Sequence, residues 1–387
     1  MFSTNSDHVD IEAVIASLNT GDSSAVKSLW LSYSNNMARH IIAVSRHFQF
    51  SLMNMLTEEA GFSGLRLSFE PVIAALARRH ASIVQNGVEL FDFRPSELAN
   101  QLGISKQVCN QTINQLEALA YVQRIADPRD GRARLLRLTD RGLSLASEGR
   151  NGIYRVATHY AELLNGKVLA TSQENNLNEL IKQLNTLVDG LDLVAPSQVK
   201  PHAIDEQLLG VLLPALSHYF SQQLLTLTQQ AGHTAITVAH GQVLALIGLD
   251  GGAIQVMASI QNISKQAMSV ITNDLEKLGY LSRSEARQST KTVLFNFTDL
   301  GWQLMADSIS AISSIENELS KILGVKSFAQ LQLALRTLYF SLKLDSELIT
   351  STEPTVSTTP EDLAKIVKRH FTSIQVDELI RFLKIEQ

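Results

Sequence analysis

The chain has 387 residues, of which 45% are hydrophobic and 18% are charged, and this composition is that of an ordinary globular protein rather than a disordered one. The length suffices for about two or three domains. The formal net charge of −5 excludes a polybasic coat that binds any polyanion, so affinity for nucleic acid would have to come from a local cluster of cations.

No segment of the sequence predicts a leader or a membrane span. The first ten residues have neither a basic start nor an apolar run, and the longest apolar stretch, 208–216, is interrupted by Gly210 and Pro214. The single cysteine, Cys109, excludes an internal disulfide framework and fits a reducing compartment. We expect a cytoplasmic protein that does not contact membranes.

The first half of the chain is predicted to be mainly helical. A long amphipathic helix is expected over 23–60, because apolar side chains recur there at spacings of three and four residues. These side chains are Leu29, Met37, Ile41, Val44, Phe48, Leu52 and Leu56. A shorter helix is expected over 70–79, and two further helices near 143–164 and 173–191 close this half.

Between these helices the sequence predicts a helix-turn-helix. Pro95 suits the start of a helix over 96–103, and Gly103 suits the left-handed position that ends it. On the second helix, 105–119, a spacing of about 100° per residue divides the side chains into two faces. The inner face comprises Val108, Cys109, Thr112, Ile113, Leu116 and Leu119, and the outer face comprises Gln107, Asn110, Gln111 and Asn114.

The four amides of the outer face allow two interpretations. They could merely keep a surface helix soluble, or they could form paired hydrogen bonds with the N6 and N7 edge of adenine in the major groove of DNA. Solvated helix faces usually carry Lys and Glu, which have better helix propensity than Asn. Together with the segment that follows, this favours base reading.

That segment predicts a β-hairpin, or wing. Strands over 121–126 and 134–138 can pair across a turn rich in Asp, Pro and Gly. Seven arginines stand against four acidic residues over 124–150, a local excess of positive charge. Arg129 and Arg134 are expected to contact phosphate or the minor groove. For Arg132 a structural ion pair with Asp130 is as plausible as a contact with DNA.

The stretch 104–142 recurs in a weaker form at 263–301, beginning with the same four residues, ISKQ, and with no gap. Its surroundings also recur in order: a long helix over 206–230, a shorter one over 241–248, and two closing helices over 303–323 and 328–344. The chain is therefore predicted to hold a first unit, 1–195, and a second, divergent unit, 203–345. Their winged heads are expected at about 65–142 and 236–301.

Three short segments fall outside the two predicted units. The proline-containing stretches 196–202 and 346–360 are expected to be linkers. The tail, 361–387, predicts a helix with two apolar stripes. It either packs as a structural clasp or binds a partner.

At 98–142 the chain resembles the MarR (multiple-antibiotic-resistance regulator) family of winged-helix transcription factors. The resemblance rests on the helix-turn-helix ELANQLGISKQVCNQTINQLEALAYV and on the wing pattern D-x-R-x-x-x-L-x-L-T-x-x-G, formed by Asp130, Arg132, Leu136, Leu138, Thr139 and Gly142. Members of the family usually form homodimers with interlaced terminal helices. The resemblance implies a mainly α fold with small β-wings, in which two winged helix-turn-helix units joined by long interlacing helices form an intramolecular pseudo-dimer.

The second head departs from this pattern. Ser289, Thr290, Lys291 and Gln288 stand where the first wing has Asp130, Gly131, Arg132 and Arg129, and the region 283–309 carries no net charge. We expect the second wing to bind DNA more weakly, and the operator to be asymmetric because unlike heads do not require a palindrome. The residues expected to contact double-stranded DNA are Lys106, Gln107, Asn110, Gln111, Asn114, Arg129, Arg132, Arg134, Lys265, Gln266, Ser269, Asn273 and Lys291.

The resemblance also implies a repressor released by a small aromatic effector, with a pocket between the first long helix and residues 69–76. No metal, cofactor or enzymatic activity is expected: His40 and His47 lack a third ligand at suitable spacing, and no phosphate loop or nucleophile motif occurs. Cys109 is expected to fill the core rather than to sense oxidants. The rival interpretation is a ligand-sensing or protein-interaction module that kept the winged-helix scaffold but lost most DNA binding.

Overall fold

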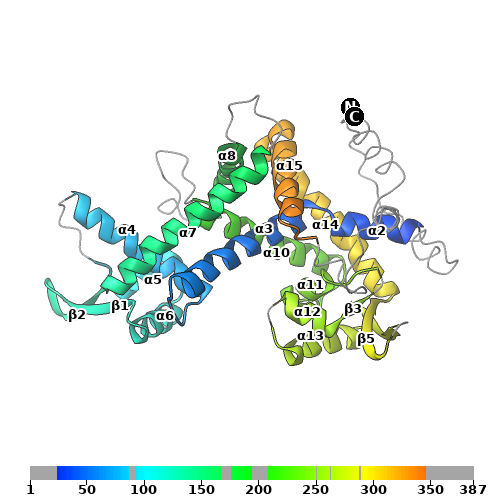
Figure 1. Cartoon of the computed structure of the whole chain (residues 1–387), viewed down its shortest axis with the longest axis horizontal. Helices are drawn as coiled ribbons and strands as arrows, with labels where there is room; N and C mark the ends of the chain where they lie inside the picture. Colours follow the sequence, from blue (N-terminus) through cyan, green and yellow to red (C-terminus); the bar gives the residue numbers. More distant parts are fainter. Residues whose placement is uncertain are drawn as a thin grey trace. The chain divides into compact units, whose positions relative to one another are not determined.

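The computed structural model describes residues 24–86, 92–166, 176–193, 208–249, 251–261, 263–286 and 289–345. These residues are mainly helical and include two small antiparallel sheets (Figure 1). Within them no helix combines the length and hydropathy needed to cross a bilayer. The predicted linkers 196–202 and 346–360 and the predicted tail 361–387 lie outside the described residues.

The structure comprises two compact units, whose boundaries do not follow the order of the chain. Among the described residues, unit 2 runs from Val44 to Ala215, and unit 1 combines residues 24–43 with residues 216–345. The boundaries fall within two long helices, α3 (Met37–Asn54) and α10 (Leu209–Gln230). Each unit therefore contains residues from both halves of the sequence.

Unit 2 contains a helix-turn-helix followed by a two-stranded hairpin. Its core includes the fully buried side chains of Leu98, Ile113, Leu116, Tyr121 and Leu136, so the two helices and the base of the hairpin share one apolar interior. Besides parts of α3 and α10, the elements of unit 2 are η1 (Met55–Glu59), η2 (Leu67–Phe69), α4 (Glu70–Asn86), α5 (Pro95–Leu102), α6 (Lys106–Ala118), β1 (Val122–Asp127), β2 (Asp130–Leu138), α7 (Asp140–Asn165) and α8 (Asn176–Gly190).

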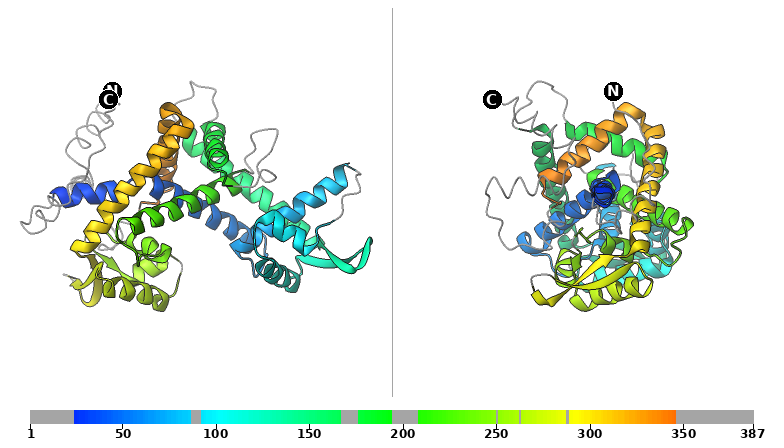
Figure 2. Two further views of the ribbon diagram at one scale, coloured as in Figure 1. Left: turned by 180° about the vertical axis from the view of Figure 1, so that it is seen from behind. Right: turned by 90° about the vertical axis from the view of Figure 1, so that its right-hand side faces the viewer.

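In unit 1 the elements follow a similar order, with a third short strand added to the sheet in the order β3-β5-β4. Trp30 on the first helix packs with Trp302, Met305 and Ala306 on α14 in one buried cluster, and Figure 2 shows these two helices side by side. The elements are α2 (Ser24–Ser34), α11 (Val238–Leu244), β3 (Gly252–Ala253), α12 (Ile254–Ile260), α13 (Lys265–Lys277), β4 (Leu281–Ala286), β5 (Ser289–Phe297), α14 (Asp299–Leu323) and α15 (Val325–Ser341), together with parts of α3 and α10.

The single long helix expected over 23–60 is wrong, because the chain breaks into α2, α3 and η1. The Asn36 side chain donates to the carbonyl groups of Ser32 and Tyr33, and its Oδ1 accepts from the Arg39 N–H at 2.9 Å. Asn36 thus ends α2 and caps α3 with its own amide, which competes with the backbone hydrogen bonds of a continuous helix. Apolar periodicity passes through this break and does not reveal it.

Several local contacts of the first winged head have counterparts in unit 1. Thr139 Oγ1 accepts from the Gly142 N–H at 3.0 Å at the start of α7, and Thr298 Oγ1 accepts from the Gly301 N–H at 3.1 Å at the start of α14. Ser105 and Ser264 cap α6 and α13 in the same way. The two stretches that are similar in sequence therefore have the same types of capping residue, Thr and Ser, at the starts of their matching helices.

Candidate nucleic-acid interface

The helix-turn-helix forms as its local signals predict. Gly103 has a φ of 66°, the left-handed conformation expected at the end of α5, and Ser105 Oγ accepts from the Val108 N–H at 3.2 Å at the start of α6. Cys109, Ile113 and Leu116 are fully buried. These side chains fix which face of α6 points toward the core and which points outward.

The predicted amide face lies on the outer side of α6. Gln107, Asn110, Gln111 and Asn114 are all exposed. Asn114 is also anchored to the hairpin, because its Oδ1 accepts from Arg124 Nη2 on β1 at 2.7 Å, and Arg124 forms an ion pair with Glu117 as well. The wing thus orients the last amide of this face.

Val108 differs from the prediction that it belongs to the inner face. The Val108 side chain is 50% exposed, because Val108 lies in the first turn of α6 at the edge of the inner face. Its neighbour Cys109 is fully buried. The other predicted inner positions are buried or half-buried. The outer face of α6 is therefore wider than the four amides and includes the apolar side chain of Val108.

The wing is a hairpin whose two strands pair antiparallel from Val122 with Leu138 to Asp127 with Asp130, with an irregular register at Asp127. The side chain of Asp127 is fully buried at the tip end of β1. Its carboxylate accepts from Arg94 Nη2 at 2.7 Å and Nε at 2.9 Å, and from Arg129 Nε at 3.0 Å and Nη2 at 3.1 Å. The hydrogen bonds from Arg129, followed by those from Arg94, hold the pKa of Asp127 well below its usual value, so this carboxylate stays ionised.

The structure distinguishes bound from available cations among the wing arginines. Arg129, which was expected to contact DNA, is paired with Asp127, and Arg137 is paired with Asp92 at 2.6 Å. The exposed Arg132 contacts Asp130 only through its backbone N–H, at 3.1 Å. Among the described residues, the guanidinium groups of Arg132 and Arg134 have no ion-pair partner.

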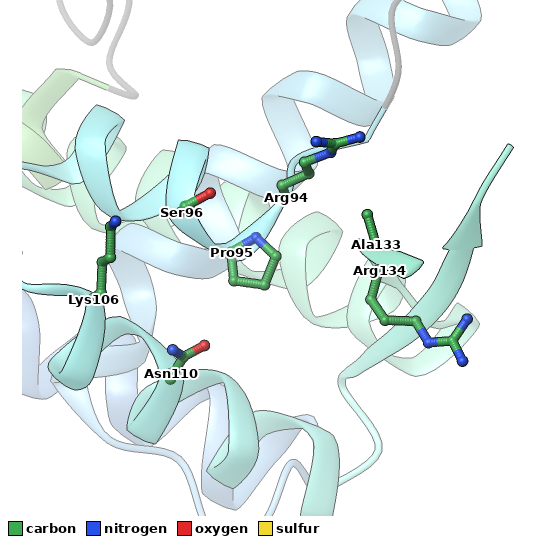
Figure 3. A pocket seen from close by; sticks show the side chains of 7 residues that line it. All are labelled: Arg94, Pro95, Ser96, Lys106, Asn110, Ala133 and Arg134. Atoms are coloured by element: carbon green, nitrogen blue, oxygen red, sulfur yellow. The ribbon is translucent and has the colours of Figure 1, made fainter. Parts of the chain in front are cut away.

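A cleft of about 350 Å³ separates the hairpin from the helix-turn-helix (Figure 3). Lys106 and Asn110 project from α6 toward the start of α5, and Arg134 extends from β2 on the other side. The lining residues are Arg94, Pro95, Ser96, Lys106, Asn110, Ala133 and Arg134. Arg94 is already paired with Asp127, so Lys106 and Arg134 are the cations of this cleft that are placed to bind a phosphate backbone.

Arg94 is the charged member of this site that was not predicted from the sequence. It directly precedes Pro95, a position that suggests only a helix start, and its partner Asp127 lies 33 residues further along the chain. No spacing rule connects two residues so far apart. The link depends on how β1 packs beside α5 and becomes apparent only in the folded protein.

The second head presents a different surface. Lys265 and Gln266 are exposed on α13, whereas Ser269 and Asn273 are half-buried. Asn273 Oδ1 accepts from Arg283 Nη2 at 2.6 Å, and Arg283 forms an ion pair with Glu276, which repeats the arrangement of Asn114, Arg124 and Glu117. The side chain of Lys291 lies outside the described residues.

Cys109 is fully buried against the Pro95 carbonyl, at an Sγ–O distance of 3.6 Å, and burial raises the pKa of its thiol. We expect Cys109 to resist a thiol reagent such as DTNB in the native protein and to react fully in urea. The residual native reaction should begin at a higher pH than for free cysteine, because less thiolate is present at a given pH. Rapid labelling of the native protein at pH 7 would contradict this.

The described residues contain no group of three or more His, Cys, Asp or Glu placed to hold a metal ion. His40 contacts Asn35 at 3.0 Å, and His47 contacts the Tyr160 hydroxyl at 3.0 Å. Both histidines thus have partners within the protein.

Comparison with known families identifies the first head. A model of the MarR family matches residues 86–133, a range that holds α5, the turn, α6, β1 and the first part of β2. A search of curated proteins finds no match. Residues 86–133 thus form a MarR-family domain, and this match indicates a transcription regulator of the winged-helix type.

Proposed function

We propose that this chain is a sequence-specific, double-stranded-DNA-binding transcription regulator in which α6 enters the major groove. The observation that carries the proposal is the exposed amide face of Gln107, Asn110, Gln111 and Asn114 beside a cleft lined by Lys106 and Arg134. Amides can read adenine edges, while cations on either side bind the phosphates that flank the groove. Among the wing arginines we assign the phosphate or minor-groove contacts to Arg132 and Arg134, and to Arg129 only a secondary share because Asp127 already binds it.

The two heads contribute unequally in this proposal. On α13, Val270 replaces Gln111 on the outer face, and Ala253 and Ala286 replace Arg94 and Asp127. The second head offers Lys265, Gln266, Ser269, Asn273 and Lys291 as weaker contacts. The recurring contacts in the two heads, and the composition of each unit from both halves of the sequence, support a fused intramolecular pseudo-dimer.

A repressor released by a small aromatic ligand is the mode of action that we propose, with the ligand bound between α3 and residues 69–76. The proposal of release rests on likeness to the MarR family alone. The alternative function, a ligand-sensing or protein-interaction module, is favoured by one observation: the outer face of α13 carries Val270, 68% exposed, where the first head has an amide.

A salt series distinguishes the two functions. We expect Arg132→Ala combined with Arg134→Ala to weaken binding to the chain's own promoter duplex and to make the slope of log K against log salt shallower by about 2, at roughly 0.9 per phosphate contact. Anisotropy measurements with a labelled duplex provide both values. A matched control, Arg155→Ala with Lys182→Ala, removes the same charge from α7 and α8 and should leave the slope almost unchanged.

Weak binding to every duplex, with a slope that does not change in the wing variant, would favour the alternative function. Footprinting adds an independent check, because unlike heads predict one strongly and one weakly protected half-site. An inverted repeat protected equally on both sides would contradict the proposed inequality of the heads.

A further inference from the structure

The outer part of the first wing has few attachments to the rest of its head. At the base of the hairpin, the Leu136 N–H donates to the Phe93 carbonyl at 2.8 Å, and Arg124 holds β1 against α6. A two-stranded hairpin alone is at best marginally stable in water. The orientation of its tip therefore depends on whatever holds the residues beyond Ile125.

The Asp127 carboxylate provides that attachment. Arg94 reaches it from the segment just before α5, and the Arg94 backbone N–H in turn donates to Glu97 Oε2 at 3.0 Å within α5. From the other side, Arg129 donates its backbone N–H to Asp127 Oδ1 at 3.0 Å and closes the turn. One buried carboxylate thus joins the wing tip to the first helix of the helix-turn-helix.

The second head lacks this connection, because it has no charged side chains at the two positions concerned. Ala253 and Ala286 occupy the positions of Arg94 and Asp127, and β3 pairs with β5 through Gly252 with Phe295 and Ala253 with Leu294. The first head has the matching bridge between Phe93 and Leu136, so this backbone attachment at the base of the hairpin is common to both heads. The ion-pair cluster of Arg94, Asp127 and Arg129 therefore has no counterpart at the matching positions 253 and 286 of the second head.

We propose that Asp127 is a positioning residue for DNA binding, which holds the wing tip so that Arg132 and Arg134 lie beside the groove entered by α6. This inference rests on the proposed function. It predicts an effect opposite to that of simple electrostatics, because removing a negative charge near DNA should otherwise tighten binding. Asp127 acts through the orientation of the two arginines and not through a contact of its own.

The test compares Asp127→Asn with Asp130→Asn on a duplex that the wild-type protein binds. The first change keeps the size of the side chain but places an amide N–H where two guanidinium groups converge, so we expect binding about 10-fold weaker. The control removes the same charge from an exposed carboxylate that lies 3.7 Å from Arg94. This control should bind as well as the wild type or more tightly.

A second measurement separates positioning from general structure. In the background of Arg132→Ala with Arg134→Ala, the change Asp127→Asn should cause no further loss, because the groups that it positions are gone. Unchanged or tighter binding by Asp127→Asn alone would overturn the inference, as would an equal loss in both backgrounds. A wild-type protein that binds no duplex overturns the proposed function, and this inference with it, before any variant is compared.

Discussion

Trp30→Ala is expected to lower the free energy of unfolding of unit 1 by about 3 to 5 kcal/mol, the usual cost of emptying a buried aromatic position. The Trp30 side chain is 4% exposed and packs with Trp302, Met305 and Ala306 on α14. α2 belongs to the first half of the sequence but completes the core of unit 1. The substitution should therefore destabilise the unit that carries the second head.

Urea unfolding followed by tryptophan fluorescence measures this effect selectively. The chain has two tryptophans, both in this cluster, so the remaining Trp302 reports on unit 1 while circular dichroism reports on all helices. Leu333→Ala on α15, where the side chain is 65% exposed, is the matched control and should change stability by less than about 0.5 kcal/mol. A Trp30→Ala protein within 1 kcal/mol of the wild type, roughly, would show that α2 contributes little to this core.

Gly142→Ala is expected to destabilise unit 2 by about 3 kcal/mol and to weaken DNA binding. A Cβ at this position would lie 2.1 Å from the backbone oxygen of Tyr121, and that oxygen also accepts from the Thr139 N–H at 3.1 Å. The backbone at Gly142 cannot move away without shifting the start of α7, and the backbone at Tyr121 cannot move away without shifting the base of β1. A displaced hairpin would carry Arg132 and Arg134 away from α6.

A control for this prediction lies in the same helix. A Cβ added at Gly149 in α7 would have no atom within 4 Å. We therefore expect Gly149→Ala to stabilise the protein by up to about 1 kcal/mol, because Ala has the higher helix propensity. The same chemical change is thus expected to have opposite signs at two positions of one helix, which thermal unfolding can measure. A stable Gly142→Ala protein with wild-type DNA affinity would contradict the close approach of α7 and Tyr121.

The helix-turn-helix and wing were the parts most accessible to prediction from the sequence, because local signals determine them. Gly103 marks the end of α5, Ser105 the start of α6, and the turn residues 127–131 place the hairpin, and each of these features is present in the structure. The exposure of the four amides also follows directly from helical periodicity. Their role in base reading stays a prediction.

Features that depend on contacts between distant segments could not be predicted. The break at Asn36 results from a side chain that competes with the backbone, which an apolar pattern does not record. The pairing of Arg129 with Asp127, and of both with Arg94, depends on how β1 lies beside α5. A count of arginines in the sequence therefore overestimates the number of cations available to a ligand. Helical periodicity also places Val108 on the inner face of α6, whereas its side chain is exposed.

The exchange of segments between the two units affects how this gene can evolve. Recombination that replaced only the first half with that of a related gene would bring in a foreign α2 and set an unmatched side chain against Trp302. We therefore expect the two halves to change together at this cluster, even though the exposed faces of α6 and α13 are free to diverge.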